Sequence, residues 1–262
     1  MYDFNYHRPG SVEEAASALG GEAKLVAGGM TLIPTLKQRL AQPSDLVDLG
    51  GIAALKGVSE DGGAVVIGAM TTHAEVAADG TVQSRIPALA SLANGIGDAQ
   101  VRNCGTIGGS IANNDPAADY PAALVGLGAT VRTNKREIAA DDFFTGMFET
   151  ALADDEIVTA VAFPVPEKAA YAKFANPASR YAIVGVFVAQ GPSGTRVAVT
   201  GAGPSVFRSA DMESALGGNF SAAAIEGVSV SDSGLNSDIH ASAEYRAHLV
   251  GVMARRAVAA AG

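Results

Sequence analysis

The sequence predicts two α+β domains with a boundary close to residue 165, and three observations support this fold class. Short apolar stretches alternate with segments that begin at helix-capping residues and carry helical periodicity. Pro164 and Pro166 directly follow an apolar strand and mark a break in regular structure. Beyond Lys168 the order changes to three consecutive strand candidates followed by helices. We therefore expect one domain over residues 1–166 and a second over residues 167–262.

The first sixty residues predict helix, strand, helix and strand in that order. Ser11 and Glu14 have the spacing of a capping box, in which a hydroxyl and a carboxylate satisfy free amides at a helix start. Gly20 and Gly21 end this first helix. The elements after it are a strand over residues 24–27, a Gly28–Gly29 turn, a helix over 31–40 with Pro34 in its first turn, and a strand over 46–49.

A second block continues this domain and contains a long irregular passage. Thr72 and Glu75 repeat the capping-box spacing before a short helix. From Gly95 to Asp119 the chain is rich in glycine and has neither helical nor strand periodicity, so we predict irregular backbone there. The elements around it are helices over 86–94 and 120–127 and strands over 65–67, 130–132 and 156–163.

The second domain is predicted from three strands and a long terminal helix. The strand candidates cover residues 171–175, 183–190 and 195–202. The run over 242–260 indicates an amphipathic helix, because Tyr245, Leu249 and Met253 share one face at i, i+4 spacing.

Charge and composition exclude several classes of function. The 262-residue chain has a formal net charge of −9 and scattered basic residues, whereas a nucleic-acid binder gathers Lys and Arg on one face. No stretch approaches 18 consecutive apolar residues, which predicts no membrane span. The N-terminal segment lacks a signal-peptide pattern, which favours the cytoplasm. Cys104 is the only cysteine, so this chain alone cannot form a disulfide, an iron–sulfur cluster or a Cys-rich zinc site.

Two glycine-rich segments are the candidate ligand-binding sites. One is AGGMTL, residues 27–32, at a strand-to-helix junction, and the other is TIGGS, residues 106–110. Adjacent glycines let the backbone approach a diphosphate without a Cβ clash, and the amides of a helix start add a positive field. A tight turn is the simpler interpretation of one isolated Gly-Gly pair. Two such segments, the second long and polar between core-like elements, favour a ligand.

Other binding and catalytic motifs are missing from the sequence. No G-x-G-x-x-G follows a strand, and there is no Walker loop or G-x-S-x-G elbow. The four histidines, His7, His73, His240 and His248, have no metal-ligand spacing, and we interpret them as surface or capping residues. We interpret Cys104 as a lone buried cysteine without an activating motif.

Two aspartates follow the second glycine segment. Asp115 and Asp119 have positions suited to capping the helix that begins near Pro116 and Pro121. Alternatively, a carboxylate there accepts hydrogen bonds from ribose or ribityl hydroxyls. For Asp119 the sequence leaves both interpretations open.

Four stretches of the sequence form a recognisable set: AGGMTLIP, QVRNCGTIGGSIANNDPAADYPAAL, KFANPASRYAIVGV and TGAGP. In these stretches the chain resembles the flavoprotein (medium) subunits of the molybdenum hydroxylases, a family that includes aerobic carbon monoxide dehydrogenase and the flavin domain of xanthine dehydrogenase. The similarity runs from Phe4 into the last helix. It implies an FAD-binding domain of the PCMH type, with two subdomains, up to about residue 165. A small C-terminal α+β domain with a three-stranded sheet and helices would follow.

The resemblance also implies which residues bind FAD. The first glycine segment would hold the diphosphate, and the second would approach the cofactor. Asp119 would bind FAD hydroxyls, Val158 would flank the adenine, and Lys173 would lie near the ribityl or flavin portion. The full set implied in this way is Ala27, Gly28, Gly29, Met30, Thr31, Leu32, Ile96, Thr106, Ile107, Gly108, Gly109, Ser110, Asn113, Asp119, Val158 and Lys173.

This sequence departs from the family pattern at three places. Members of the family often have a polar residue at the position of Met30 and an Asn at the position of Ser110. The PASRYA stretch differs from an Asp-containing version of the motif. Tyr181 within it would either face the flavin or pack between sheet and helix.

In function, the resemblance implies an electron-transfer subunit that carries FAD but no catalytic acid, base or nucleophile. A partner large subunit would hold the molybdenum cofactor, and a partner small subunit would hold [2Fe-2S] clusters and deliver electrons to FAD. The assembly would be a heterotrimer, often doubled. The substrate (carbon monoxide, an aldehyde, an N-heterocycle or a purine) and the acceptor (quinone, NAD, a cytochrome or oxygen) stay open. The alternatives are a stand-alone flavin oxidase or reductase of the same fold and a non-catalytic scaffold.

Overall fold

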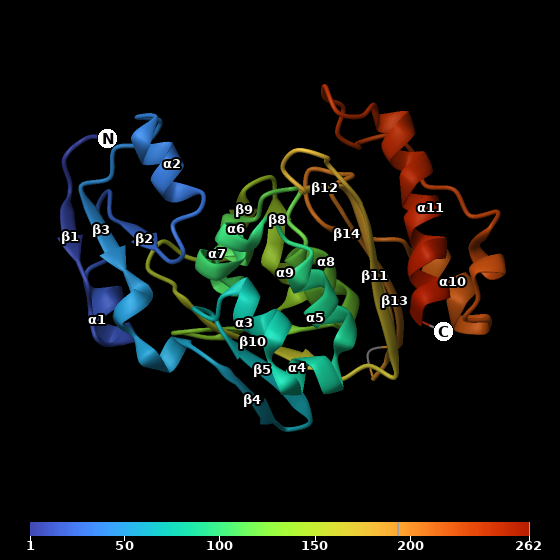
Figure 1. Ribbon diagram of the computed structural model, residues 1–262, viewed down its shortest axis with the longest axis horizontal. Coiled ribbons are helices and arrows are strands. Elements are labelled where there is room, and N and C mark those ends of the chain that lie inside the picture. The colour runs from blue at the N-terminus through green and yellow to red at the C-terminus, as the bar shows by residue number, and fades with distance from the viewer. Residues whose placement is uncertain (193, 262) are drawn as a thin grey trace.

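Three structural parts lie side by side in the order of the chain, and each has its own apolar cluster (Figure 1). The structure is a computed structural model and describes residues 1–192 and 194–261. The first part is the blue end of the ribbon, the second the green centre, and the third the orange and red end. The observed mixture of helices and mainly antiparallel sheets agrees with the predicted α+β class.

The first part is a small parallel sheet with two short helices. Its chain order is β1 (Asn5–His7), α1 (Val12–Ser17), β2 (Lys24–Val26), α2 (Leu32–Lys37) and β3 (Asp45–Asp48). The sheet order is β1-β3-β2, with both pairs parallel. Strand β1 was not predicted, because a three-residue exposed strand has no apolar alternation to reveal it. Both helices are shorter than predicted, and two 3₁₀ turns, η1 (Leu49–Gly51) and η2 (Ala53–Leu55), lead into the second part.

The second part is an antiparallel five-stranded sheet covered by helices. Its strands, in sheet order, are β4 (Val58–Asp61), β5 (Ala64–Gly68), β10 (Val158–Pro164), β6 (Thr130–Thr133) and β7 (Glu137–Ala139). The helices between β5 and β6 are α3 (His73–Ala78), α4 (Gly80–Arg85), α5 (Pro87–Asn94), α6 (Ala99–Cys104), α7 (Ile107–Asn113) and α8 (Tyr120–Leu127). A short helix α9 (Ala140–Phe143) and the hairpin of β8 (Phe144–Gly146) and β9 (Glu149–Thr150) follow β7.

The prediction of irregular backbone from Gly95 to Asp119 is wrong, because α6 and α7 lie within this passage. Each is only a few residues long, and the glycines of α7 weaken any sequence-based preference for a helix. Their capping residues are the signal that was available. The Asp98 carboxylate accepts a hydrogen bond from Val101 N–H (2.8 Å), and the Thr106 hydroxyl accepts one from Gly109 N–H (3.1 Å).

The third part is a sheet between two sets of helices. It contains β11 (Lys168–Ala175), β12 (Ala182–Gly191), β13 (Gly194–Thr200), the two-residue β14 (Phe207–Arg208), α10 (Ala210–Gly218), the 3₁₀ turn η3 (Ala222–Ile225) and α11 (Ala243–Ala261). The three long strands confirm the predicted ones, and β14 adds a short edge. Helices α5 and α8 pack on one face of the sheet, and α10 and α11 pack on the other.

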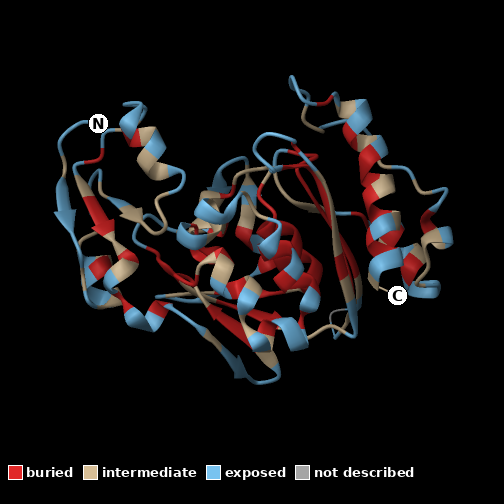
Figure 2. Ribbon diagram, viewed as in Figure 1, coloured by how far each residue is buried: buried red, intermediate tan, exposed pale blue. Residues whose placement is uncertain are grey.

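Strand β12 is buried on both faces, as Figure 2 shows for the centre of this sheet. Because successive side chains of a strand point to opposite faces, Phe187 joins the core of the second part while Val186 and Val188 join the core under α11. The third part is therefore attached to the second part by a shared apolar core.

Three further sequence expectations need correction or refinement. Thr72 and Glu75 form the predicted capping box, whereas Glu14 accepts its hydrogen bond from Gly10 N–H and not from Ser11. Leu249 and Met253 are buried as expected, but Tyr245 packs its ring edge on Phe174 and stays largely exposed. Cys104 is exposed, because it ends the short helix α6. Within the described residues, no helix is both long and apolar enough to cross a membrane.

Candidate functional site

The first glycine segment contains a run of backbone amides without protein partners. Strand β2 ends at Val26 and α2 begins at Leu32, so the chain turns from strand to helix within residues 28–32. Among the residues that the structure describes, none accepts a hydrogen bond from an amide of residues 28–32; the first paired amide is Ile33 N–H, which donates to Gly29 O (3.0 Å). Five consecutive free donors at a helix start form a fixed positive region suited to an anion.

Two glycines make this backbone path sterically possible. Gly29 has φ of +70°, a conformation that side-chain-bearing residues rarely adopt, and a Cβ there would also lie 2.9 Å from Ile33 Cγ1. Gly28 lies against α6, where a Cβ would stand 2.8 Å from the Cα of Gly105. The tight turn and the ligand interpretation are thus compatible, because the turn itself presents the free amides.

The backbone amides of the second glycine segment, unlike those of the first, already have hydrogen-bond partners within the protein. The N–H of Ile107 donates to Thr71 O (3.1 Å), and the N–H of Gly108 donates to Ala69 O (2.8 Å). The Gly109 amide is used by the Thr106 cap. These three amides therefore already have protein partners and, unlike those of the first segment, are not free donors.

The glycines of α7 instead allow close packing. A Cβ on Gly108 would lie 2.6 Å from Ala69 Cβ, and a Cβ on Gly109 would lie 3.3 Å from Ala27 Cβ. The absence of side chains lets α7 lie directly on the end of β5 and beside the first glycine segment. The two glycine segments therefore form one continuous surface, called the floor below, although only the first segment has backbone amides without partners.

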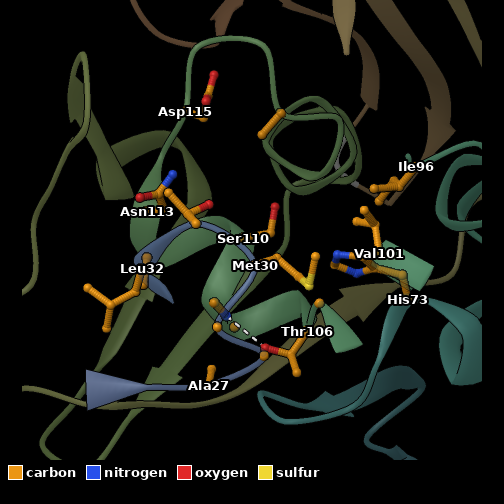
Figure 3. Close-up of a pocket in the computed structure, with 18 of the residues that line it drawn as sticks. Ala27, Met30, Leu32, His73, Ile96, Val101, Thr106, Ser110, Asn113 and Asp115 are labelled. Carbon is orange, nitrogen blue, oxygen red and sulfur yellow. Dashed lines mark hydrogen bonds between the residues drawn. The ribbon is translucent and has the colours of Figure 1, made fainter. Parts of the chain in front are cut away.

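A cavity of about 620 Å³ lies above this floor, between the first and second parts (Figure 3). This size falls within the range of roughly 300–1,000 Å³ typical of ligand and cofactor pockets. Of the predicted cofactor-binding residues, those that line it are Ala27, Gly28, Gly29, Met30, Thr31, Leu32, Ile96, Thr106, Gly108, Gly109, Ser110, Asn113, Asp119 and Val158. Ile107 and Lys173 are not in the lining: Ile107 is fully buried in the core, and the ammonium of Lys173 pairs with Asp119.

Polar side chains without partners face this cavity. The hydroxyl of Ser110 and the amide of Asn113, both on α7, make no hydrogen bond to any residue within 1–192 or 194–261. Figure 3 shows Ser110 beside Met30 and Asn113 just above Leu32 in this view, with Asp115 farther from both. Together with the free amides they offer donors and acceptors to a bound molecule.

Asp119 lies at the centre of a buried polar group. Its carboxylate accepts a hydrogen bond from the Tyr171 hydroxyl (2.5 Å) and pairs with Lys173 Nζ at 3.0 Å. Lys173 also donates to Gly95 O (2.9 Å). Burial raises the pKa of the Asp119 carboxyl, and the charge of Lys173 opposes that shift. The pair therefore links β11 to the start of α8 and to the segment that carries Ile96.

The capping interpretation of the two aspartates is wrong in its details. Asp119 precedes α8 but makes no side-chain cap, because its carboxylate turns towards β11. Asp115 closes a turn through Ala117 N–H (2.9 Å) and not the start of a helix. Both carboxylates line the cavity, and Asp119 keeps lone pairs for further donors.

Several cavity residues were missed at the sequence level. Ala69 and Met70 follow β5, Val101 and Gly105 belong to α6 and its end, and His73 begins α3. Their proximity depends on the packing of α3 and α6 against each other, which no local motif encodes. The interpretation of His73 as a surface residue is wrong, because this residue is only 4% exposed.

Tyr181 is one of the residues that line the cavity. Its ring lines the wall and is 44% exposed. It also borders a second cavity of about 440 Å³, with Met147 and Phe148 from the β8–β9 hairpin in its wall. The neighbouring Arg180 guanidinium donates to Gly97 O (3.1 Å), which fixes this loop to the segment after Ile96.

Comparison with known proteins assigns the chain to a family. Residues 2–166 match the family described as the FAD binding domain in molybdopterin dehydrogenase. The chain belongs to this flavoprotein family. Residues 169–261 match the CO dehydrogenase flavoprotein C-terminal domain, so the two matches cover nearly the whole flavoprotein.

Relatives align with this flavoprotein over nearly their whole length, and a solved structure shares its fold. It is 36% identical to the carbon monoxide dehydrogenase medium chain of Hydrogenophaga pseudoflava, over 98% of this chain and 96% of that one. It is also 36% identical to the nicotine 6-hydroxylase medium subunit of Paenarthrobacter nicotinovorans, with the same two coverages. The solved structure of reconstituted CO dehydrogenase from Oligotropha carboxidovorans contains a chain with a TM-score of 0.90 and 35% identity, covering 99% of this chain and 98% of that one.

These relationships confirm the resemblance found in the sequence, the fold of an FAD-binding domain followed by a domain of sheet and helices, and the oxidoreductase class. FAD is the cofactor of the family, and the cavity fits it. FAD carries a diphosphate, and the lining of the cavity includes a run of free amides suited to bind one. A Cβ at Gly28 or Gly29 would obstruct that backbone turn.

Proposed function

We propose that this flavoprotein is the electron-transfer subunit of a molybdenum hydroxylase and receives electrons from [2Fe-2S] clusters of a partner. FAD supplies the redox chemistry, because it accepts electrons singly or in pairs. The protein binds, orients and insulates it. The observation that carries the proposal is the run of unpaired amides at residues 28–32, which matches a single diphosphate.

Each side of the cavity has a defined role in this proposal. The amides of residues 28–32 bind the diphosphate, and Ser110 and Asn113 on the neighbouring helix α7 donate and accept further hydrogen bonds. Asp119 accepts hydrogen bonds from cofactor hydroxyls, with Tyr171 and Lys173 holding its orientation. The remaining predicted residues fix position: Ala27, Thr106, Ile107, Gly108 and Gly109 build the floor, and Ile96 and Val158 supply apolar walls, the latter beside the adenine.

The partners follow from what this chain lacks. With a single cysteine it cannot hold an iron–sulfur cluster by itself, and the described residues contain no group of metal-ligating side chains. We therefore assign the molybdenum cofactor to a large subunit and the clusters to a small subunit, assembled as a heterotrimer and its dimer. An exposed thiol at Cys104 suits a reducing compartment, so we place the complex in the cytoplasm.

Co-purification tests this assignment. A tagged chain expressed in its native host is expected to retain two partners, with molybdenum and iron in the complex and FAD released on denaturation. Purification of the chain alone, loaded with flavin and reduced directly by an organic substrate, would favour the stand-alone oxidase or reductase. A colourless chain that takes up no added FAD would favour the scaffold.

A further inference from the structure

His73 is a buried polar side chain in the cavity wall that the roles above leave unused. It is the first residue of α3, and its own N–H donates to Gly105 O (3.0 Å). Its ring packs against that of Tyr120, with centroids 5.3 Å apart and planes tilted by 50°. Backbone pairing and ring packing therefore fix the orientation of the imidazole within the cavity wall.

Neither ring nitrogen of His73 has a hydrogen-bond partner among the described residues. His73 is 4% exposed; its Nδ1 atom is fully buried, and Nε2 is the ring nitrogen that keeps accessible surface. An unpaired buried polar atom is costly, so native structures usually supply a partner. Burial and the charge of Arg102 lower the pKa of His73 to about 4, so near neutral pH the ring presents one donor and one acceptor.

The surroundings of His73 indicate which part of a cofactor would reach it. Figure 3 shows its ring beside Met30, Val101 and Ile96, which form apolar walls at one end of the cavity, while Leu32 and Asn113 lie towards the other end. Apolar walls with a polar group among them suit a heteroaromatic ring whose edge carries N–H and C=O groups.

Exposed residues border the same end of the cavity. Ile96 and Gly97 are tied through Arg180 to the loop of the half-exposed Tyr181. A flavin ring that exchanges electrons with outside molecules must lie near the surface, whereas the adenine of FAD has no such requirement. The end with His73 therefore suits the isoalloxazine ring.

We propose that His73 contacts FAD by a hydrogen bond to the polar edge of the isoalloxazine ring. This inference rests on the proposed function, since it takes FAD as the ligand. His73 is then a specificity group for the flavin half of the cofactor, while the amides of residues 28–32 recognise the diphosphate.

Titration of the flavin-free full chain with FAD and with ADP tests this role. ADP contains the diphosphate and adenosine but no flavin. His73→Phe keeps a ring and removes both nitrogens, and we expect it to raise the dissociation constant of FAD roughly two- to tenfold, the value of one net hydrogen bond, without changing that of ADP. His73→Gln restores a donor and acceptor and is expected to recover most of the FAD affinity. His248 is an exposed histidine on α11. The variant His248→Phe is the matched control and is expected to leave the dissociation constants of FAD and ADP unchanged.

Each other outcome overturns a different claim. Equal affinity of wild type and His73→Phe for FAD, or equal loss of FAD and ADP binding, contradicts a flavin contact. Failure of the wild-type chain to bind either ligand contradicts the proposed function itself. If His73→Phe does not fold, NMR of the labelled wild-type imidazole decides: its ring nitrogen signals must shift with FAD and not with ADP.

Discussion

The backbone of Gly28 lies directly against Cys104, so that a Cβ atom on Gly28 would stand 2.7 Å from the carbonyl carbon of Cys104. The free amides of the first glycine segment thus begin where that segment touches the end of α6. This contact joins the first part of the protein to the second at the floor of the FAD cavity. It also makes the position of the amide run sensitive to a single methyl group.

Gly28→Ala is expected to reduce FAD occupancy at least tenfold, because the methyl group forces the segment away from α6 and displaces the amides. The measurement is the ratio of flavin to protein absorbance after purification with added FAD. Gly227→Ala is the control, since a Cβ there meets nothing within 4 Å. Normal flavin content in Gly28→Ala would show that the amide run does not depend on this contact.

Lys173→Met is expected to lower the free energy of unfolding at pH 7 by about 3 kcal/mol, because it leaves the Asp119 carboxylate buried without its cation. The double variant with Asp119→Asn is expected to recover much of this loss. Urea denaturation measures both, with Lys168→Met on the same strand as an exposed control. Equal stability of the single and double variants would contradict coupling between the two charges.

Protonation of His73 is expected to make the protein less stable as the pH falls from about 6.5 to about 4. The pKa of His73 is lowered to about 4 in the fold, so within this window the unfolded chain binds a proton that the folded chain does not. The lost stability amounts to about 3 kcal/mol at the lower end. Urea denaturation from pH 7 to pH 4 should show this slope in the wild type and a shallower one in His73→Gln. Parallel slopes in the two proteins would refute the assignment.

Glu156 is expected to give a second acid-sensitive step at lower pH. Arg136, Thr133 and the Ala153 amide hydrogen-bond its carboxylate and hold its pKa at about 2. A lowered pKa stabilises the fold above the ordinary value of 4.5, and this stability is lost as the pH falls towards about 2. Glu156→Gln should be less stable at pH 6 and should lack the loss below pH 4.5. Since Glu156 precedes the cavity residues Ile157 and Val158, FAD affinity is also expected to decrease.

The sequence predicted those parts of the fold that local patterns encode. The long strands β12 and β13 and helix α11 have apolar runs of sufficient length, and the capping box at Thr72 is a local signal. Strand β1 and helices α6 and α7 were not predicted from the sequence, because they are short and are stabilised by tertiary pairing. Thr106, for example, caps α7 only while Ile107 and Gly108 pair with the segment after β5.

The motifs predicted part of the candidate site, but the remaining site residues come together only through the packing of distant segments. The glycines of both segments were identified, but the sequence could not show that the amides of Gly108 and Gly109 are already paired while those of residues 28–32 are free. It also treated His73 as a surface residue, since burial of a lone histidine depends on how α3 packs against its neighbours. Lys173 was predicted to lie near the cofactor; it does not line the cavity itself, but it pairs with Asp119, which does.

The most direct test of the account is an NMR titration of the ¹⁵N-labelled chain with ADP, followed by FAD. The account predicts that the amide signals of residues 28–32 shift strongly with both ligands, because those amides bind the shared diphosphate, while the amides of Gly108 and Gly109 keep their intramolecular partners and shift little. Strong shifts at Gly108 and Gly109 without shifts at residues 28–32 would contradict it.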